Sequence, residues 1–253
     1  SKTYTLPQAK EISPYRYVGV NFNSQGNPNL KPSDNYNLDL KWDFNPTPTE
    51  LISLTAFYKL IKNPISRIEV ASAGGYLSYE NIADKATVAG VEIEIRKNLF
   101  VRPVSNAAHG MNKLSLGLNG SYIYTNAKMP LATVTTGSQL EGAAPWIVNF
   151  DLSHNFTKGE RSFVNTLVLN YVSDKIYTIG TQGYQDVMEQ GVLILDFVSQ
   201  AKLNKHLSLN LKARNLLNPS YKLSRKANEN GEKVILNDYK KGINISLGVS
   251  CTF

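Results

Sequence analysis

The sequence predicts an all-β protein that spans a membrane as an antiparallel β-barrel. Three observations lead to this fold class: long segments in which apolar and polar residues alternate, charged residues that avoid the middle of the apolar positions, and short connections that alternate with long ones. The alternation is clearest in residues 239–253, where every second residue from Tyr239 to Phe253 is apolar or aromatic except Lys241. Because successive side chains of a strand point to opposite faces, this segment has one apolar and one polar face.

The predicted strands are longer than those of most soluble domains. Strands of globular proteins usually run about five or six residues, whereas a strand that crosses a bilayer obliquely needs about 9–11. Segment 161–174 alternates least cleanly and is predicted from its β-branched and aromatic residues. The full set is nine complete strands and the end of a tenth, residues 1–5, 34–45, 50–62, 86–97, 113–126, 145–157, 161–174, 191–203, 207–216 and 239–253.

The distribution of charged residues favours a membrane over water. On the apolar parity, charges stand only at strand ends, and aromatic residues gather there too, as in the interfacial girdles of outer-membrane barrels. A Lys or Arg on the lipid face at mid-bilayer would cost roughly 2–4 kcal/mol. A soluble sandwich or soluble barrel, which is the alternative, would carry charges along its whole solvent face. The charged residues concerned are Glu50, Lys62, Lys97, Arg161 and Lys241.

The connections alternate in the way that outer-membrane barrels require. Short links lie near residues 45–50, 157–161 and 203–207, whereas the link 98–112 is longer than this pattern predicts. Outer-membrane barrels have short periplasmic turns and long outer loops, which puts Phe253 at the periplasmic end. The predicted long loops are residues 6–33, 63–84, 127–144, 174–190 and 217–238.

Composition agrees with a barrel and excludes a helical membrane protein. Hydrophobic residues make up 42% of the chain, mean hydropathy is −0.25, and no run approaches the ~20 apolar residues of a spanning helix. The first residues lack the features of a signal peptide and fall in or beside a strand, so we expect the carboxy-terminal part of a longer protein. The single cysteine, Cys251, excludes an internal disulfide and is expected to contact lipid.

Neither nucleic-acid binding nor catalysis is predicted. The net charge of +7 comes without a finger, helix–turn–helix or RNP-like pattern, and the three histidines lack metal spacing. Glu92 and Glu94 share an inner face and are interpreted as hydrated wall or as partners of Arg96 and Lys113. We therefore predict no enzyme, no cofactor and no metal site. A basic cluster is interpreted as a solvated loop or as attraction to lipopolysaccharide or an acidic substrate, and it contains Lys222, Arg225, Lys226 and Lys233.

Several motifs occur in the order of a known receptor family. A Gly-Asn-Pro-x-Leu-x-Pro loop leads into an Asn-Tyr-x-Leu strand at Asn35, and Arg214-Asn-Leu-Leu-Asn-Pro219 is followed by Tyr221. With the terminal Phe253, this ordered set resembles a TonB-dependent outer-membrane receptor over essentially all 253 residues, and in style the receptors of Bacteroidota. The family residues of the loop are Gly26, Asn27, Pro28, Leu30 and Pro32.

The end of the chain resembles the insertion signal that the barrel-assembly machinery reads. The residues that carry this resemblance are Gly248, Cys251 and Phe253. Cys251 departs from the aromatic or large aliphatic residue that is usual there, and Ser33 stands where an acidic residue often follows the motif loop. These departures leave the subfamily open but not the class.

The resemblance implies a barrel of about 22 strands closed by an amino-terminal plug, of which this chain would supply the last ten. The expected partners are outer-membrane lipid and lipopolysaccharide, the plug and remaining barrel of the same receptor, the TonB complex through that plug, and a surface lipoprotein in receptors that handle oligomers. Unpaired sheet edges in lipid cost several kcal/mol per backbone group, so we expect the chain not to be stable alone in a membrane.

The implied function is active uptake of a scarce nutrient across the outer membrane of a Gram-negative bacterium. The ligand classes left open are a ferric siderophore, a vitamin, a glycan and a peptide, and the alternative function is a passive porin or a structural or secretion-associated barrel. Aromatic residues in two long loops suit stacking on sugars or chelates, although loops that pack on themselves explain these residues equally well. They are Tyr76, Tyr79, Tyr177 and Tyr184.

Overall fold

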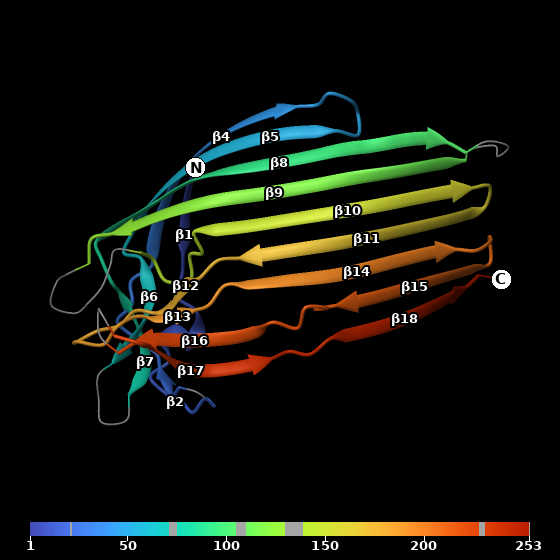
Figure 1. Ribbon diagram of the computed structural model, residues 1–253. Helices are drawn as coiled ribbons and strands as arrows, with labels where there is room; N and C mark the ends of the chain where they lie inside the picture. Colours follow the sequence, from blue (N-terminus) through green and yellow to red (C-terminus); the bar gives the residue numbers. More distant parts are fainter. Residues whose placement is uncertain (21, 71–74, 105–109, 130–138, 228–230, 253) are drawn as a thin grey trace.

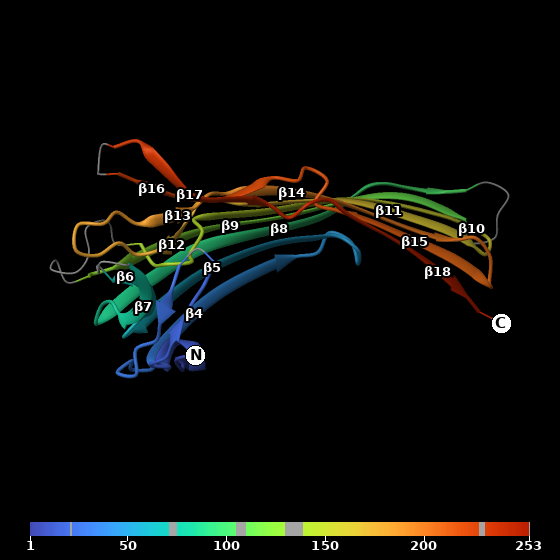
Figure 2. The ribbon, with the colours of Figure 1, turned by 90° about the horizontal axis from the view of Figure 1, so that it is seen from below.

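The computed structural model describes residues 1–20, 22–70, 75–104, 110–129, 139–227 and 231–252. Ten strands of this part form one antiparallel sheet, which is open and has β1 and β18 at its edges (Figure 1). Figure 2 shows that the sheet is arched rather than flat. In order across the sheet, the strands are β1 (Lys2–Thr5), β4 (Ser33–Phe44), β5 (Leu51–Lys62), β8 (Lys85–Pro103), β9 (Met111–Ala127), β10 (Trp146–Lys158), β11 (Arg161–Val172), β14 (Val192–Lys202), β15 (Leu207–Arg214) and β18 (Asn244–Cys251).

The strand register puts the predicted apolar residues on one face of the sheet. One row runs across six strands through Leu54, Ile93, Gly120, Val148, Tyr171 and Leu193. Many of these apolar side chains are exposed, with 74% of Leu40 and 72% of Leu247 accessible. A soluble domain rarely exposes such a continuous apolar surface, whereas a lipid-facing sheet requires one. The predicted fold class, a transmembrane barrel sheet, is confirmed in these terms.

Strand β11, which alternates least cleanly, takes its faces from its neighbours. Leu167 pairs with Leu152 of β10 and Phe197 of β14, on the apolar face. Val168 pairs instead with Asp151 and Asp196, on the polar face. The valines of β11 therefore lie on a face that is otherwise mainly polar.

The long connections gather at one end of the sheet, at the left of Figure 1, and the short turns at the other. Four of the predicted long loops, 6–33, 63–84, 174–190 and 217–238, each contain strands, which corrects their interpretation as loops. Together they form a body that we call the cap, consisting of α1 (Ala9–Ile12), β2 (Arg16–Tyr17), β3 (Ser24–Gln25), β6 (Ile65–Val70), β7 (Tyr76–Asn81), β12 (Lys175–Thr178), β13 (Val187–Glu189), β16 (Ser220–Lys226) and β17 (Lys233–Lys240).

Two four-stranded sheets make up the cap, in the orders β12-β13-β16-β17 and β2-β3-β7-β6. Short strands of this kind gain their stability from non-local pairing, which local alternation does not reveal. A parallel bridge between Ile68 and Ile179 joins the two sheets. The described residues contain no helix long and apolar enough to cross a membrane.

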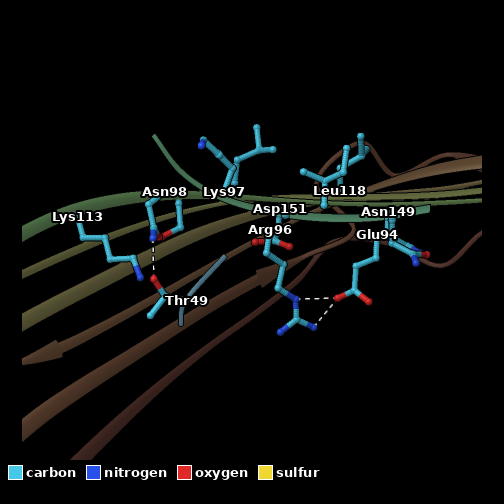
Figure 3. A pocket seen from close by; sticks show the side chains of 14 residues that line it. Thr49, Glu94, Arg96, Lys97, Asn98, Lys113, Leu118, Asn149 and Asp151 are labelled. Carbon is cyan, nitrogen blue, oxygen red and sulfur yellow. Dashed lines mark hydrogen bonds and ion pairs between the residues drawn. The ribbon is translucent and has the colours of Figure 1, made fainter. Parts of the chain in front are cut away.

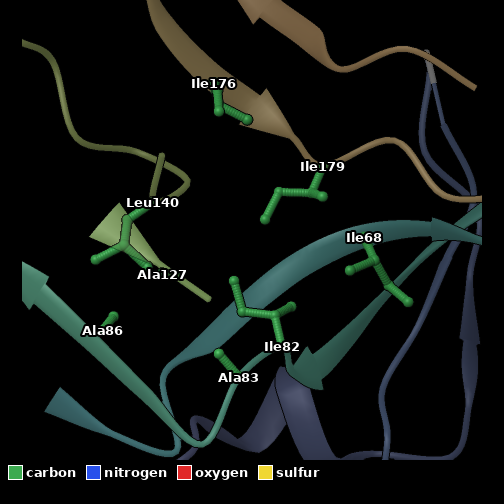
Figure 4. Close-up of a cluster of buried hydrophobic side chains, with 8 residues drawn as sticks. All are labelled: Ile68, Ile82, Ala83, Ala86, Ala127, Leu140, Ile176 and Ile179. Carbon is green, nitrogen blue, oxygen red and sulfur yellow. The ribbon is translucent and has the colours of Figure 1, made fainter. Parts of the chain in front are cut away.

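The buried apolar core lies within the cap and where the cap meets strands β8 and β9 of the ten-stranded sheet. Ile68, Ile176 and Ile179 from the cap face one another there (Figure 4). Ala86 of β8 and Ala127 of β9, each 1% exposed, belong to the same cluster and anchor the cap on the sheet. The other members are Ile82, Ala83 and Leu140.

The predicted strand 239–253 is interrupted, which is a second correction. Strand β17 ends at Lys240 and β18 begins at Asn244, and the two belong to different sheets. At the bend Gly242 has a φ of +80°, its carbonyl oxygen accepts 2.6 Å from Asn215 Nδ2, and its N–H donates to Asn218 Oδ1 at 3.0 Å. The predicted strand 207–216 likewise ends at Arg214, because Asn215 has a φ of +58° that interrupts strand geometry.

The predicted strand 86–97 is too short. Strand β8 runs on to Pro103 through a register shift between Asn98 and Phe100, so most of the long link 98–112 is strand. Lys97 therefore lies inside a strand rather than at its end, and its Nζ lies 3.5 Å from Glu50 Oε1. The backbone N–H of Asn98 also donates to Glu50 at 3.0 Å, and this bond, together with Lys97, holds the pKa of Glu50 below its usual value.

Candidate ligand-binding groove

The Gly-Asn-Pro-x-Leu-x-Pro loop fastens helix α1 to the cap. The Gly26 N–H donates to Ser13 O at 2.9 Å, and the Asn27 N–H donates to Glu11 O at 2.6 Å. A Cβ at Gly26 would lie 2.5 to 2.7 Å from the carbonyl oxygens of Ser13, Lys10 and Glu11, so only glycine permits this approach. Gly26 therefore has a structural reason to be in the motif.

The same loop is bonded to the β6–β7 hairpin. Asn27 Nδ2 donates to Tyr79 O at 3.0 Å, while the side chain of Asn81 bonds both backbone groups of Lys31, at 2.8 and 3.0 Å. Leu30 closes the turn through its N–H, which donates to Asn27 O at 3.3 Å. The motif thus positions the backbone of the strand that carries Tyr79. The remaining motif residues, Pro28 and Pro32, are exposed.

Two hollows in the cap adjoin at Val20 and Tyr177, and we call them together the aromatic groove. The larger has a volume of about 400 Å³ and lies on one face of the sheet β12-β13-β16-β17. The smaller, of about 230 Å³, reaches towards α1, β6 and β7. The lining of the aromatic groove includes Lys10, Phe22, Arg67, Tyr79, Tyr177, Glu189, Tyr221, Asn237 and Tyr239.

Two of the four predicted ligand-loop aromatics meet in this groove. Tyr79 comes from β7 and Tyr177 from β12, so segments far apart in sequence supply them. Tyr76 lies under Arg16 instead, with its ring centroid 5.7 Å from Arg16 Cζ. Tyr184 lies outside the groove beside Arg225, 5.2 Å from its Cζ.

Sequence reasoning missed Tyr221 and Tyr239 as groove residues. Their rings stack with centroids 5.4 Å apart and an interplanar angle of 20°. The uninterrupted alternation of the last segment put Tyr239 on the lipid face, whereas the bend at Gly242 turns it into the cap. Tyr221 stands two residues after Pro219, the last residue of the Arg214–Pro219 motif. This position was the signal that could have identified Tyr221 as a groove residue.

The groove tyrosines are held by neighbouring cations. Arg67 donates through Nε to Tyr177 O at 3.0 Å, its Cζ lies 3.9 Å from the Tyr177 ring centroid, and its Nη2 lies 2.8 Å from Glu141 Oε1. Lys241 Nζ lies 3.9 Å from the Tyr221 ring centroid. Burial raises the pKa of Glu141 despite Arg67, and burial also raises the pKa of Tyr79.

Charges around the groove are largely compensated in pairs. Lys222 pairs with Asp238 at 3.5 Å, and Glu189 pairs with Lys175 at 3.4 Å. Together with the Arg67–Glu141 pair, these contacts neutralise most of the charged lining. The groove therefore offers aromatic surface and a few polar groups rather than a strong field.

A second hollow, of about 420 Å³, lies on the polar face of the ten-stranded sheet. Figure 3 shows Glu94, Arg96 and Asp151 on one side of the strands and Lys97 and Leu118 on the other, as the parity predicts. Arg96 pairs with Glu94 of its own strand at 2.7 Å. This ion pair matches the interpretation of these carboxylates as wall residues.

Glu92 and Lys113 differ from the expectation that Lys113 pairs with a wall carboxylate. Glu92 accepts from Asn119 Nδ2 at 2.8 Å, and Lys113 lines the hollow beside Asn98 and Ser115. A Cβ at Gly117 would overlap the Asp151 carboxylate, so this glycine leaves room for the wall carboxylate. The result is a mainly polar surface around this hollow.

The family model described as TonB dependent receptor-like, beta-barrel matches residues 1–216. The chain belongs to this family. Solved structures with the same fold include the copper transporter OprC, at 14% identity and a TM-score of 0.64 over 100% of this chain and 37% of that one. A mutant ferric enterobactin receptor, PfeA from Pseudomonas aeruginosa, matches at 18% identity and a TM-score of 0.54, again over 100% and 37%.

The outer membrane transporter YddB from Escherichia coli is also similar, at 13% identity and a TM-score of 0.51 over 89% of this chain and 33% of that one. At these identities the likeness shows the fold alone. The chain spans about a third of the length of these receptors and transporters. No curated protein matches it.

The residues of the predicted insertion signal and the basic cluster both fall on the last strands of the chain. Gly248 of β18 pairs with Asn210, and Cys251 is exposed and pairs with Leu207, whereas Phe253 lies outside the described residues. Their role as an insertion signal stays a prediction. The basic cluster is not a solvated loop, because it lies on β16 and β17 and two of its members are paired, Lys222 with Asp238 and Arg225 with Glu69.

Each of the two described histidines, His154 and His206, has a hydrogen-bond partner of its own. His154 Nε2 lies 2.8 Å from Asn112 Oδ1, and His206 Nδ1 lies 2.7 Å from Thr252 O. His109 falls outside the described residues. Within the part of the chain that the structure describes, no three His, Cys, Asp or Glu residues gather in a way that could hold a metal ion.

Proposed function

We propose that this chain forms barrel wall and outer cap in an outer-membrane receptor that imports a scarce nutrient with energy delivered through TonB. Membership of the TonB-dependent receptor-like β-barrel family supports this function. The observation that carries it is the register, which keeps polar residues aligned on one face of ten strands and apolar residues on the other. A wall of this kind separates lipid from a wet lumen.

Each region of the molecule then has a role. The apolar face contacts outer-membrane lipid and lipopolysaccharide, and the polar face lines the lumen against a plug supplied by the remainder of the receptor. The plug, rather than this chain, contacts TonB. The cap meets the nutrient outside the cell, alone or with a surface lipoprotein, and it performs no catalysis. An origin in Bacteroidota stays a prediction from the sequence.

The test compares import with passive diffusion in the full-length receptor. In planar lipid bilayers, the purified receptor is expected to show no steady ion conductance, because a plug closes the lumen. In cells, growth that depends on the receptor is expected to disappear when the gene for TonB is deleted. A steady conductance together with TonB-independent growth would identify a passive porin and overturn the proposal.

A further inference from the structure

The aromatic groove is elongated, and its tyrosines are spread along it. Tyr79 lies in the smaller hollow and the Tyr221–Tyr239 stack in the larger, with Tyr177 where the hollows adjoin. The two volumes, about 400 and 230 Å³, together fall in the range of small-molecule sites, about 300–1,000 Å³. This shape suits a chain of linked rings better than a compact chelate.

The rings are positioned before any ligand binds. Arg67 Cζ lies 3.9 Å from the centroid of the Tyr177 ring, and Arg67 Nε donates to the Tyr177 carbonyl oxygen. The centroid of the Phe22 ring lies 6.3 Å from that of Tyr177. The Tyr221 ring contacts both the Tyr239 ring and Lys241 Nζ. Because these side chains are already fixed, little conformational entropy is lost when a ligand stacks on them.

The charge of the lining disfavours a strongly charged ligand. An anionic chelate would need several unpaired cations, but Arg67 is engaged by Glu141 and Lys222 by Asp238. Lys10 lines the smaller hollow without a carboxylate partner among the described residues, and its Nζ lies 5.8 Å from the Tyr17 ring centroid. A cationic ligand would need unpaired carboxylates, and Glu189 is engaged by Lys175. With three pairs compensated, Lys10 is the lining charge without a carboxylate partner in the described part of the chain, so stacking and hydrogen bonds outweigh charge in deciding affinity.

Polar groups beside the rings match a ligand with many hydroxyl groups. Asn237 is half-buried and lines the larger hollow together with Tyr239 and Glu189, and its side-chain amide can both donate and accept hydrogen bonds. The phenol groups of the tyrosines add hydroxyls that also donate and accept. Sugars present apolar C–H faces for the rings and hydroxyls for these groups.

We propose that the aromatic groove binds a neutral oligosaccharide, an inference that rests on the proposed function and names the class of nutrient. The sugar rings stack along Tyr79, Tyr177 and Tyr239, and Asn237 bonds their hydroxyls. The cap thereby selects an uncharged glycan chain over a metal chelate.

The experiment measures equilibrium binding to the purified full-length receptor. An array of neutral oligosaccharides that includes maltohexaose, cellohexaose and xylohexaose supplies the probes, and ferric enterobactin is the anionic comparison. At least one neutral oligosaccharide is expected to bind. Ferric enterobactin is expected neither to bind the groove nor to displace the bound oligosaccharide. Tyr239→Ala and Tyr177→Ala are each expected to weaken the binding about fivefold to tenfold, the loss of one stacked ring.

Matched variants separate stacking from folding. Tyr177→Phe keeps the ring and the contact with Arg67, so it is expected to bind within about twofold of the native receptor. Tyr239 lies on β17, the edge strand of its sheet, so Tyr239→Ala tests the site even if Tyr177→Ala disturbs the cap. Tyr15→Ala is the control, because Tyr15 is 76% exposed and lies outside the lining, and it is expected to leave binding unchanged.

Binding of no neutral oligosaccharide, or binding that survives both Tyr239→Ala and Tyr177→Ala, overturns this inference. Tight binding of ferric enterobactin that Tyr239→Ala abolishes also overturns it, in favour of a chelate. The outcome is separate from that of the proposed function, because a receptor with TonB-dependent growth and no glycan binding contradicts the inference alone. A barrel that binds glycan through the groove but shows steady conductance and TonB-independent growth contradicts the proposed function alone.

Discussion

The ten-stranded sheet and the cap hold their apolar side chains in opposite ways. In the sheet, Leu40 and Leu247 project from the face and stay largely exposed, whereas in the cap Ile179 and Val187 are 1% and 0% exposed. The sheet is stabilised by its backbone ladder and needs lipid as the solvent of one face. The cap buries its own core, as a domain in water does. Mutations should therefore act through lipid in one region and through packing in the other.

The largest effect is expected from a charge on the apolar face of the sheet. Leu118 lies between Ile95 and Phe150 near the middle of β9, so Leu118→Arg puts a guanidinium into lipid. The full-length receptor in phospholipid vesicles is expected to lose roughly 2–4 kcal/mol of unfolding free energy, measured by chemical denaturation. Ser121→Arg puts the same charge on the polar face opposite Glu92 and is expected to change stability little. Equal losses in both variants would remove the distinction between the faces.

The next effect is expected from overpacking the cap at Gly26. Gly26→Ala forces α1 away from the motif loop, because three carbonyl oxygens occupy the space of the new Cβ. Hydrogen exchange is expected to show a local loss of about 1–3 kcal/mol in β7 and none in β10. Gly120→Ala is the matched control in the sheet, since its Cβ would meet only Ile93 at an ordinary 3.7 Å. Uniform loss of protection in β7 and β10 would show that cap and sheet unfold as one.

The same contrast explains what the sequence predicts and what it does not. The local alternation of apolar and polar residues specifies the two faces of the sheet. The apolar row through Ile93, Val148 and Leu193 therefore follows from that alternation alone. The cap depends on contacts between distant segments, such as Ile68 with Ile179, for which no local pattern exists. Half of the aromatic groove was predictable from loop composition, and the half containing Tyr239 was not.

Tyr239 shows the physical reason for that failure. Its segment keeps one apolar parity to the end of the chain apart from Lys241, and within it only Lys241 and Gly242 mark the bend. The bend is specified by Asn215 and Asn218, whose side chains bond the two backbone groups of Gly242. A signal that lies on another strand cannot be read from periodicity.

A smaller effect is expected where the sheet joins the cap. Asn215 has a φ of +58°. In Asn215→Ala the left-handed conformation is expected to lower the stability of this joint by about 1–2 kcal/mol, and the bond to Gly242 is lost in addition. Asn215→Gly loses only the bond and is expected to destabilise less. Hydrogen exchange in the β15–β18 and β16–β17 ladders measures both. If the two variants lose equal protection, the backbone conformation at Asn215 carries no strain and the side-chain bond alone holds the joint.

The smallest effect concerns pH and a single carboxyl group in the cap. Burial raises the pKa of Glu141 above 4.5, its ordinary value, so the folded cap binds more protons than the opened cap between 4.5 and that raised pKa. The cap is therefore expected to be more stable at the acidic end of this window and to lose that stability as the pH rises through the raised pKa. The amide of Gly142, which donates to Ile176 O at 2.9 Å, reports this opening by hydrogen exchange. Comparing the native chain with Glu141→Gln at each pH removes the pH dependence of the intrinsic exchange rate, which is the same in both. Protection of Gly142 in the variant is expected to be independent of pH. A native cap that gains protection as the pH rises would show that the ion pair with Arg67, rather than burial, dominates Glu141.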